Sequence, residues 1–317
     1  MLDKKDSKLV SELLMNARTP LVTLSKSCQL KRENVAYRMA RLEKQGIIKG
    51  YGAIINTTHF GFKQYVILFQ LEKLKESKEK EIMDFLISTG YISWIGVLTG
   101  RWSLTFDIYA RDETDVSEKL KSIFHNLENH IADYSFLCLS EKEYFYNKLI
   151  KSKNLTIQKP VVKHSTDKLD SKILQLLNQN ARITYADLSP RLHLTANAIK
   201  RRIKQLEKSG IILGYTAYID PTKMGLEWYG IELKQLKFDE SDEKKIKHFL
   251  RIHPSVVFYY KYVDSSWSVG VLVKNPQELR KFISQLRYEL SEEVKLNDFF
   301  IVLSEVTTYS LPKCVFQ

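Results

Sequence analysis

The 317-residue sequence is poor in cysteine, and its three cysteines (Cys28, Cys138 and Cys314) lie far apart. An odd number without paired spacing predicts neither a disulfide framework nor a zinc site and fits a reducing compartment. No uncharged apolar run approaches the ~18 residues that a membrane span requires. The charged opening, residues 1–6, predicts no secretory leader. These absences exclude a secreted scaffold, a zinc finger and a membrane protein, and they predict a cytoplasmic location.

Catalytic signatures are also missing. There is no phosphate loop, no nucleophile elbow and no cysteine near a histidine at a recognisable spacing. The spacings His130/Glu128 and His248/His253 leave a metal or acid–base site open as an alternative, but histidines without such a role are far commoner. We therefore expect no catalytic residue, no metal and no cofactor. The seven histidines are His59, His125, His130, His164, His193, His248 and His253.

Positive charge is in excess, and it is concentrated in three segments. The chain has 49 Lys and Arg against 37 Asp and Glu, a net charge of +12. Residues 1–56 hold 11 bases and 5 acids, residues 167–220 hold 9 and 5, and residues 150–166 hold 4 lysines and no acid. These segments carry +6, +4 and +4, so the remainder of the chain carries −2. Localised positive charge attracts a polyanion, most often nucleic acid.

Two of the basic segments are repeats of one another at an offset of 164 residues. Between Asp6/Asp170 and Gly61/Gly225 the register needs no gap, and 23 of the 56 pairs are identical. The longest shared block is Leu-Glu-Lys-x-Gly-Ile-Ile-x-Gly-Tyr, which begins at Leu42 and again at Leu206. Similarity then weakens, but residues 100–103 (Gly-Arg-Trp-Ser) and 265–268 (Ser-Ser-Trp-Ser) are matched after one inserted residue. The sequence therefore predicts a tandem duplication of one unit.

Each repeat begins with three short amphipathic patterns, the third of which follows a tight turn. The third helix buries an i, i+4, i+7 stripe, and Gly46 and Gly210 are expected to end it in a left-handed conformation. The β-prone run that follows each glycine predicts a small wing hairpin. Three helices with a turn before the third are typical of a helix-turn-helix, whose last helix enters the major groove. The stripes are Val35, Met39 and Leu42 in the first repeat and Ile199, Ile203 and Leu206 in the second.

The outward faces of the two third helices hold the candidate DNA contacts. Arg38 and Arg202 lie at the edge of the stripe, where they could reach either a phosphate or an internal acid. A merely solvated basic face is the plain alternative, but the repetition of the whole pattern and the charge segregation favour DNA. The candidate DNA-binding residues are Lys31, Arg32, Asn34, Tyr37, Arg38, Arg41, Thr195, Asn197, Lys200, Arg201, Arg202 and Lys204.

The second part of each repeat reads as strand, helix, two strands, helix, strand. This βαββαβ order predicts a ferredoxin-like sandwich and an α+β fold, which by itself implies no function. The strands have more apolar surface than one sheet face needs, so we expect the two sandwiches to pack sheet against sheet, within a chain or between chains. In the first repeat the predicted strands are 64–71, 92–98, 104–110 and 132–139, and the helices are 78–88 and 114–127. In the second the strands are 229–236, 256–262, 268–273 and 298–306, and the helices are 242–252 and 276–290.

The motifs of the two repeats resemble those of the leucine-responsive regulator (Lrp/AsnC) family. Their tandem arrangement is most similar to archaeal members of that family. The match comprises Leu2-Asp3-x-x-Asp6, Asn-Ala-Arg in the first helix and the shared block into the wing. The resemblance implies a winged helix-turn-helix for DNA and a ligand-sensing, dimerising α/β domain. The predicted domains are a winged helix-turn-helix at 1–60, a sensing domain at 61–149, a basic linker at 150–166, and the second pair at 167–224 and 225–317.

Two departures from the family pattern bear on function. A Ser or Thr usually caps the third helix; Thr195 fits, but Lys31 does not, and losing such a cap costs about 1 kcal/mol. Members that bind amino acids usually have a Gly-x-x-Asp turn. Here serine stands in place of the aspartate in both repeats, and the glycine is lost in the second. Serine offers only a neutral hydrogen bond to an ammonium group, which is weaker than a carboxylate, so an amino-acid effector is left open. The candidate effector-binding residues are Gly100, Trp102, Ser103, Ser265, Trp267 and Ser268.

The sequence thus predicts a sequence-selective duplex-DNA-binding transcription regulator and not an enzyme. Its expected partners are double-stranded DNA, a second copy or an internal pseudo-dimer, and a small-molecule effector such as an amino acid. Two alternatives stay open. One is an enzyme resembling the siroheme decarboxylases, which have a related fold with degraded helix-turn-helix parts. The other is a purely structural chromatin protein. The two recognition helices diverge on their outward faces, so we expect the two heads to read different sequences and the first to be the weaker.

Overall fold

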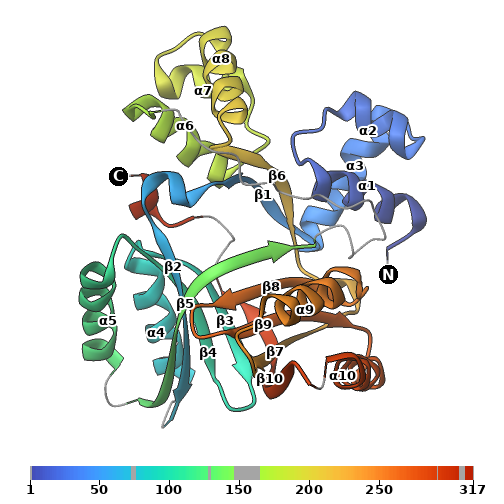
Figure 1. Ribbon diagram of the computed structural model, residues 1–317. Coiled ribbons are helices and arrows are strands. Elements are labelled where there is room, and N and C mark those ends of the chain that lie inside the picture. Colours follow the sequence, from blue (N-terminus) through green and yellow to red (C-terminus); the bar gives the residue numbers. More distant parts are fainter. Residues whose placement is uncertain are drawn as a thin grey trace. The chain divides into compact units, whose positions relative to one another are not determined.

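The computed structural model describes residues 2–72, 76–127, 130–145, 165–290, 292–306 and 311–316. Most of the predicted linker, together with Glu128 and His164, lies outside the described residues. The chain forms two compact units, and each unit draws on both repeats. The head unit contains the described parts of residues 2–63, 155–220 and 308–317, and the sheet unit contains those of 64–154 and 221–307. Figure 1 labels the elements of both.

The head unit is built from two three-helix bundles. Each helix packs through the apolar stripe expected from the sequence, for example Val35, Met39 and Leu42. The predicted turns at Gly46 and Gly210 are confirmed, because both residues adopt left-handed backbone angles, with φ of 71° and 72°. The helices are α1 (Lys4–Met15), α2 (Leu21–Cys28) and α3 (Arg32–Lys44) in the first repeat, and α6 (Lys168–Gln179), α7 (Tyr185–Leu192) and α8 (Ala196–Lys208) in the second.

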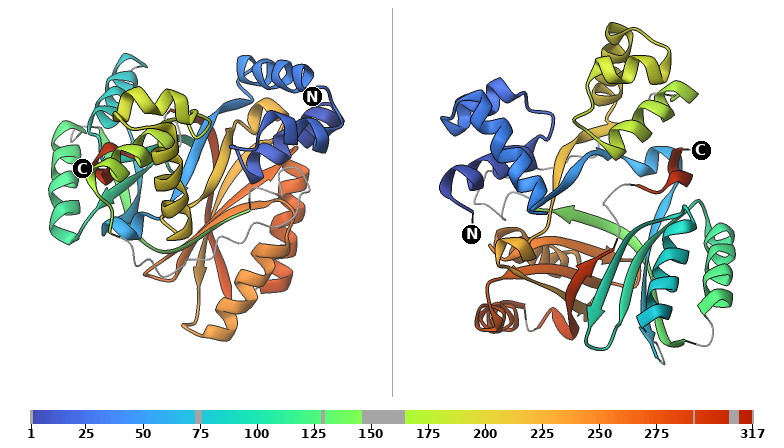
Figure 2. Two further views of the ribbon diagram at one scale, coloured as in Figure 1. Left: turned by 90° about the horizontal axis from the view of Figure 1, so that it is seen from above. Right: turned by 180° about the vertical axis from the view of Figure 1, so that it is seen from behind.

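The predicted wing hairpins are wrong in their pairing. Each β-prone run forms a single strand, and β1 (Ile48–Ile55) pairs antiparallel with β6 (Ile212–Ile219) of the other repeat (Figures 1 and 2). Gly52 faces Thr216, its own equivalent at the offset of 164, and the flanking pairs are exchanged about this point. The two heads are therefore related by a pseudo-twofold axis, as the halves of a symmetric dimer would be.

The sheet unit contains a βαββαβ sandwich from each repeat, as predicted. In each sandwich the helices cover one face of the sheet, as Figure 2 shows for α4 and α5. Short 3-10 turns are η1 (Thr57–Phe60), η3 (Thr222–Met224) and η4 (Lys313–Phe316). The first sandwich has β2 (Lys63–Leu71), α4 (Glu76–Ser88), β3 (Ile92–Thr99), β4 (Leu104–Ala110), α5 (Glu113–Leu127) and β5 (Ile131–Tyr144). The second has β7 (Glu227–Gln235), α9 (Glu240–Ile252), β8 (Val256–Tyr262), β9 (Ser266–Val273), α10 (Pro276–Leu290) and β10 (Val294–Glu305).

The two sheets join edge to edge into a closed ring in the order β10-β3-β4-β2-β5-β8-β9-β7. The closure depends on the long last strand of each repeat, since the end of β5 pairs with β8 and the end of β10 pairs with β3. Inside the ring the sheets face one another, so the predicted packing of sheet against sheet is confirmed and occurs within one chain. The buried core between the sheets is Val66, Leu68, Leu98, Trp102, Trp228, Tyr262, Leu272, Phe300 and Val302.

Candidate nucleic-acid interface

The third helix of the second head, α8, has a basic outward face. Its exposed residues between Asn197 and Lys204 include no Asp or Glu. Ile199, Ile203 and Leu206 are buried against the bundle. The helix start is fixed by Thr195, whose Oγ1 accepts a hydrogen bond from the Ala198 N–H at 3.2 Å. The polar side chains opposite the buried stripe are therefore exposed to solvent on an ordered helix. The exposed predicted contacts are Thr195, Asn197, Lys200, Arg201 and Lys204.

The first recognition helix, α3, has the same geometry but a different surface. Where α8 has Lys200, Arg201 and Lys204, α3 has Ala36, Tyr37 and Ala40. The Tyr37 side chain is 68% exposed, which is unusual for so large a hydrophobic residue. The expected loss of the cap is confirmed, because Lys31 stands at the N-cap without a side-chain hydrogen bond. The other exposed predicted contacts in this head are Lys31, Arg32 and Asn34.

Arg38 and Arg202, for which the sequence left two partners open, are placed on internal acids. Arg38 Nη1 donates to Asp3 Oδ2 and to Asp6 Oδ1, each at 2.7 Å. Arg202 repeats the arrangement with Asp167 and Asp170, each at 2.8 Å. The bonds tie the recognition helix to the start of the first helix of its own bundle. Both guanidinium groups thus have the internal acidic partners that the sequence left open as one alternative, and contact with DNA stays a prediction for them.

The electrostatic consequences of these bonds are the same in both heads. The hydrogen bond from Arg38, followed by that from the Asp6 N–H, holds the pKa of Asp3 below its usual range. The Asp170 N–H and then Arg202 do the same for the pKa of Asp167. In return, the carboxylates raise the pKa of Arg38 and of Arg202.

Arg41 also contacts an internal acid. Its Nη2 donates to Asp6 Oδ2, and Asp6 is only 3% exposed. The equivalent residue in the second repeat is Gln205, so the second head has no such arginine. Sequence reasoning missed the acidic partners Asp3, Asp6, Asp167 and Asp170, although their repetition together with Arg38 and Arg202 at one offset was a visible signal.

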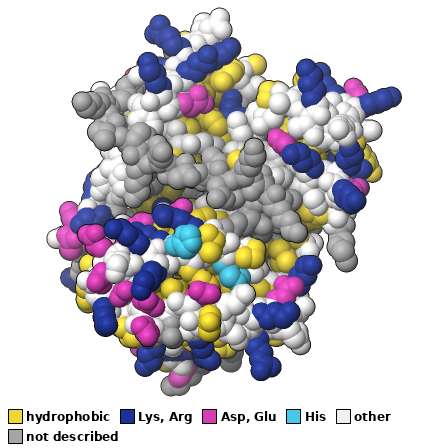
Figure 3. All heavy atoms as spheres, turned by 45° about the vertical axis from the view of Figure 1, so that its right-hand side comes forward, with side chains coloured by type: hydrophobic (Ala, Val, Ile, Leu, Met, Phe, Trp, Pro, Cys, Tyr) yellow, Lys and Arg dark blue, Asp and Glu magenta, His cyan; other side chains and the backbone are white. Residues whose placement is uncertain are grey.

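The face of the head unit that Figure 3 presents is basic. Figure 3 shows Lys and Arg side chains gathered on both of its lobes, with few acids beside them. Within the described part of the chain, no three His, Cys, Asp or Glu side chains are placed to hold a metal ion. No helix there is both long and apolar enough to cross a membrane.

The predicted correspondence between the two effector segments is wrong. Strand register places Leu104 opposite Val97 in the first sandwich and Trp267 opposite Lys261 in the second, so Trp267 is equivalent to Leu104 and not to Trp102. The second turn is one residue shorter, not longer. The two tryptophans accordingly face opposite ways: Trp102 lies between the sheets, whereas Trp267 lies in the core against the helices.

The remaining effector candidates are engaged within the protein. Ser103 Oγ accepts the Leu71 N–H at 3.1 Å, and Ser268 Oγ donates to Glu232 at 2.6 Å. Gly100 has a φ of 124°, a backbone angle that residues other than glycine rarely adopt. Ser265 has a left-handed φ of 61° in a buried turn. These residues form tight turns, and the hydroxyl groups of Ser103 and Ser268 are used in internal hydrogen bonds.

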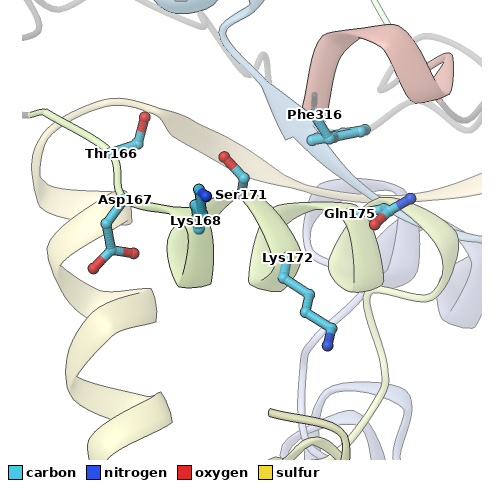
Figure 4. A pocket seen from close by; sticks show the side chains of 7 residues that line it. All are labelled: Thr166, Asp167, Lys168, Ser171, Lys172, Gln175 and Phe316. Carbon is cyan, nitrogen blue, oxygen red and sulfur yellow. The ribbon is translucent and has the colours of Figure 1, made fainter.

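A pocket of about 440 Å³ lies in the head unit beside α6 (Figure 4). In the close-up the Phe316 ring lies near Gln175, and Lys172 points away from it. The pocket shares no residue with the predicted DNA or effector sites. Its lining residues are Thr166, Asp167, Lys168, Ser171, Lys172, Gln175 and Phe316.

Comparisons with known proteins agree with the geometry of the heads. Residues 2–43 match the AsnC-type helix-turn-helix domain, and residues 166–212 match a winged helix-turn-helix DNA-binding family. An uncharacterized HTH-type transcriptional regulator of Pyrococcus furiosus is 33% identical over 125 residues, which are 39% of this chain and 81% of that protein. The regulatory protein AsnC of Haemophilus influenzae is 30% identical over 141 residues, 44% of this chain and 91% of its own length.

A solved structure is similar over nearly the whole chain. The siroheme decarboxylase NirDL aligns with a TM-score of 0.64 over 98% of this chain and 94% of that chain. The sequence identity of 11% means that this likeness concerns the fold alone. Two sandwiches and two helix-turn-helix parts in one chain are thus compatible with more than one activity.

Proposed function

The chain belongs to the Lrp/AsnC family of helix-turn-helix transcription regulators, and from this premise we propose that it reads duplex DNA selectively through α8 and α3. The observation that carries the proposal is the face of α8, where Asn197, Lys200 and Arg201 stand exposed on a capped helix whose opposite side is buried. Arginine pairs with guanine and asparagine with adenine through bidentate hydrogen bonds in the major groove. Thr195 and Lys204 would contact the backbone.

The two heads read unequal half-sites. In α3, Tyr37 and Asn34 supply methyl, base-edge or phosphate contacts, and Lys31 and Arg32 supply charge at the helix start. The exposed Glu33 beside them opposes phosphate or accepts from cytosine. Because the heads are related by a pseudo-twofold axis, the motif is an imperfect palindrome in which the half bound by α8 is the better defined.

The pseudo-dimer within one chain supplies the pairing that a single-repeat relative would obtain from a second chain. Further association of whole chains is part of the proposal, since two- and four-fold assemblies of regulators are common. To bind at the turn of residues 100–103, a small-molecule effector would have to displace the hydrogen bond between the Leu71 N–H and Ser103 Oγ. An amino acid is not favoured there because Ser103 offers no carboxylate for the ammonium group. As a regulator of a bacterial or archaeal type, the chain would act in the cytoplasm.

Binding to duplex DNA at graded salt tests the proposal. Wild-type affinity should fall steeply with salt because Lys and Arg release counterions from phosphates. Arg201→Ala should cost about 1–3 kcal/mol and relax selectivity at one base pair, as selection on randomised duplex would show. Lys244→Ala, on the exposed side of α9 in the sheet unit, is the matched control and should change nothing.

The proposal excludes catalysis, and the likeness to siroheme decarboxylase makes this worth testing. A colourless preparation that binds a specific duplex more tightly than random duplex at one salt concentration supports the regulator. A pigmented preparation without duplex binding favours the enzyme. Equal affinity for specific and random duplex favours a structural chromatin protein.

A further inference from the structure

The carboxylate of Asp6 is used differently from that of its equivalent, Asp170. In both heads one oxygen accepts from the arginine of the recognition helix, Arg38 or Arg202. The other oxygen of Asp170 accepts the Asp167 N–H at 3.3 Å and completes a capping box at the start of α6. The other oxygen of Asp6 accepts from Arg41 Nη2 instead. The first head has thus exchanged a helix-capping bond for an ion pair with a second arginine.

Arg41 lies where a DNA contact would be expected. It is four residues after Tyr37, so the two side chains leave the same face of α3. Tyr37 is 68% exposed, so this face of α3 is open to solvent. The Arg41 side chain is only 35% exposed, and its Nε has no hydrogen-bond partner among the described residues. The guanidinium group is therefore drawn toward the bundle by its contact with Asp6.

We infer that Asp6 sets the DNA affinity of the first head by withholding Arg41 from the phosphate backbone. This inference rests on the proposed function and assigns Asp6 as a positioning residue. A buried carboxylate holds an arginine more firmly than an exposed pair does, because removal of either partner leaves an uncompensated charge. The second head has no such restraint, since Gln205 replaces the arginine and Lys200, Arg201 and Lys204 are all exposed.

The test measures how the affinity for duplex DNA depends on salt in the full chain. One additional phosphate contact steepens the slope of log K against log salt by about 0.9. Asp6→Asn keeps the shape of the side chain but removes its charge, so it should release Arg41, steepen the slope by about 0.9 and tighten binding at low salt. The double variant Asp6→Asn/Arg41→Gln should return to the wild-type slope.

Two matched variants decide between this inference and a direct contact. Asp170→Asn makes the same change in the second head, where Gln205 stands in place of Arg41 and Arg202 keeps its bond to Asp167, so it should leave the slope unchanged. Arg41→Gln gives the first head the residue that the second already carries, so it should fold and leave the slope and selected motif unchanged. A slope that falls by about 0.9 in Arg41→Gln would mean that Arg41 contacts DNA in the wild type, which overturns the inference.

The remaining outcomes are equally decisive. A folded Asp6→Asn variant whose slope equals that of the wild type overturns the inference. If Asp6→Asn unfolds the first head, seen as a loss of helical circular dichroism, the slope of Arg41→Gln alone decides whether Arg41 is withheld from DNA. A wild-type chain without salt-dependent duplex binding would refute the proposed function itself, which none of the Arg41 results does.

Discussion

In the head unit, Arg18 and Arg182 are equivalent residues, and each donates a hydrogen bond to a backbone carbonyl of the other repeat. Arg18 Nη1 donates to the Ala181 carbonyl at 2.6 Å, and Arg182 Nη1 donates to the Ala17 carbonyl at 2.5 Å. Each guanidinium group also lies over a tyrosine ring of the other repeat, at 5.3 Å for Arg18 over Tyr215 and 5.5 Å for Arg182 over Tyr51. Together with the β1–β6 ladder, these contacts fix one head relative to the other.

Arg182→Ala should therefore lower the free energy of unfolding of the head unit by about 1–3 kcal/mol, because the carbonyl of the buried residue Ala17 loses a charged donor. Arg18→Ala should have a similar effect, and the double variant should lose less than the sum since the two share one interface. Denaturant unfolding followed by circular dichroism measures both. Arg191→Ala, exposed on α7, is the control. A single variant as stable as the wild type would show that the contacts of that arginine contribute nothing to the free energy of unfolding.

The unequal caps of the recognition helices allow a paired experiment. Thr195→Ala removes the bond from the Ala198 N–H and should lower stability by about 1 kcal/mol. Lys31→Thr places a cap where the backbone is already extended, with φ −68° and ψ 151°, and should raise stability by a similar amount. Thermal unfolding of the two variants should shift in opposite directions. Shifts of the same sign would contradict this account of the caps.

A buried carboxylate makes the sheet unit sensitive to pH. Burial, together with the charges of Asp298 and Asp264, raises the pKa of Glu232 to about 7, although the hydrogen bond from Ser268 opposes the shift. The folded state thus binds a proton more tightly than the unfolded state, whose glutamate pKa is about 4.3. Stability is therefore greatest below the unfolded pKa and falls as pH rises toward 7.

Glu232→Gln should remove most of this dependence, because glutamine stays neutral over the whole range. The wild type should lose roughly 3 kcal/mol of unfolding free energy between about pH 4.5 and about pH 7.5 that the variant keeps. Urea unfolding at a series of pH values gives the two curves. Glu240→Gln, on an almost fully exposed side chain, should follow the wild type. Parallel curves for wild type and Glu232→Gln would rule out Glu232 as the titrating group.

A buried side chain of α6 is hydrogen-bonded to the backbone of Leu311 near the C-terminal end of the described chain. Asn178, 2% exposed, donates to the Leu311 carbonyl at 3.1 Å and accepts its N–H at 2.9 Å. The first repeat has Leu14 at the equivalent position. Asn178→Leu should leave the backbone of Leu311 unpaired, speed hydrogen exchange at that amide and expose residues 311–316 to carboxypeptidase. Gln179→Leu, exposed on the same helix, should leave both measurements unchanged.

The elements that the sequence predicted best are those defined by local periodicity. The stripe of Ile199, Ile203 and Leu206 identified α8, and the continuous apolar run that begins at Tyr65 identified β2. The end of β5 was missed, because Glu141, Lys142 and Glu143 look like a solvated loop. These residues form strand only by pairing with β8, far away in sequence. The same reason explains the wrong wing hairpins, since nothing local distinguishes a hairpin from a single strand that pairs with the equivalent strand of the other repeat.

The candidate site divides in the same way. The outward positions of α8 follow from helical geometry and were predicted. The position of the Arg41 side chain depends on Asp6, which is 35 residues away in the sequence. Among the described residues, no other donor occupies the Asp6 oxygen that accepts from Arg41. The likeness of Trp102 and Trp267 was misleading because identical letters fell on opposite faces after a one-residue difference between the turns.

The pairing of β1 with β6 within one polypeptide has a consequence for the dose response. Two heads that meet in separate chains associate by a second-order step, so the paired fraction depends on how much protein is made. Here the strands share one backbone, and the pairing is a first-order event whose effective concentration is set by the chain itself. Occupancy of an operator should therefore rise hyperbolically with expression, without the threshold that a dissociating dimer imposes at low abundance.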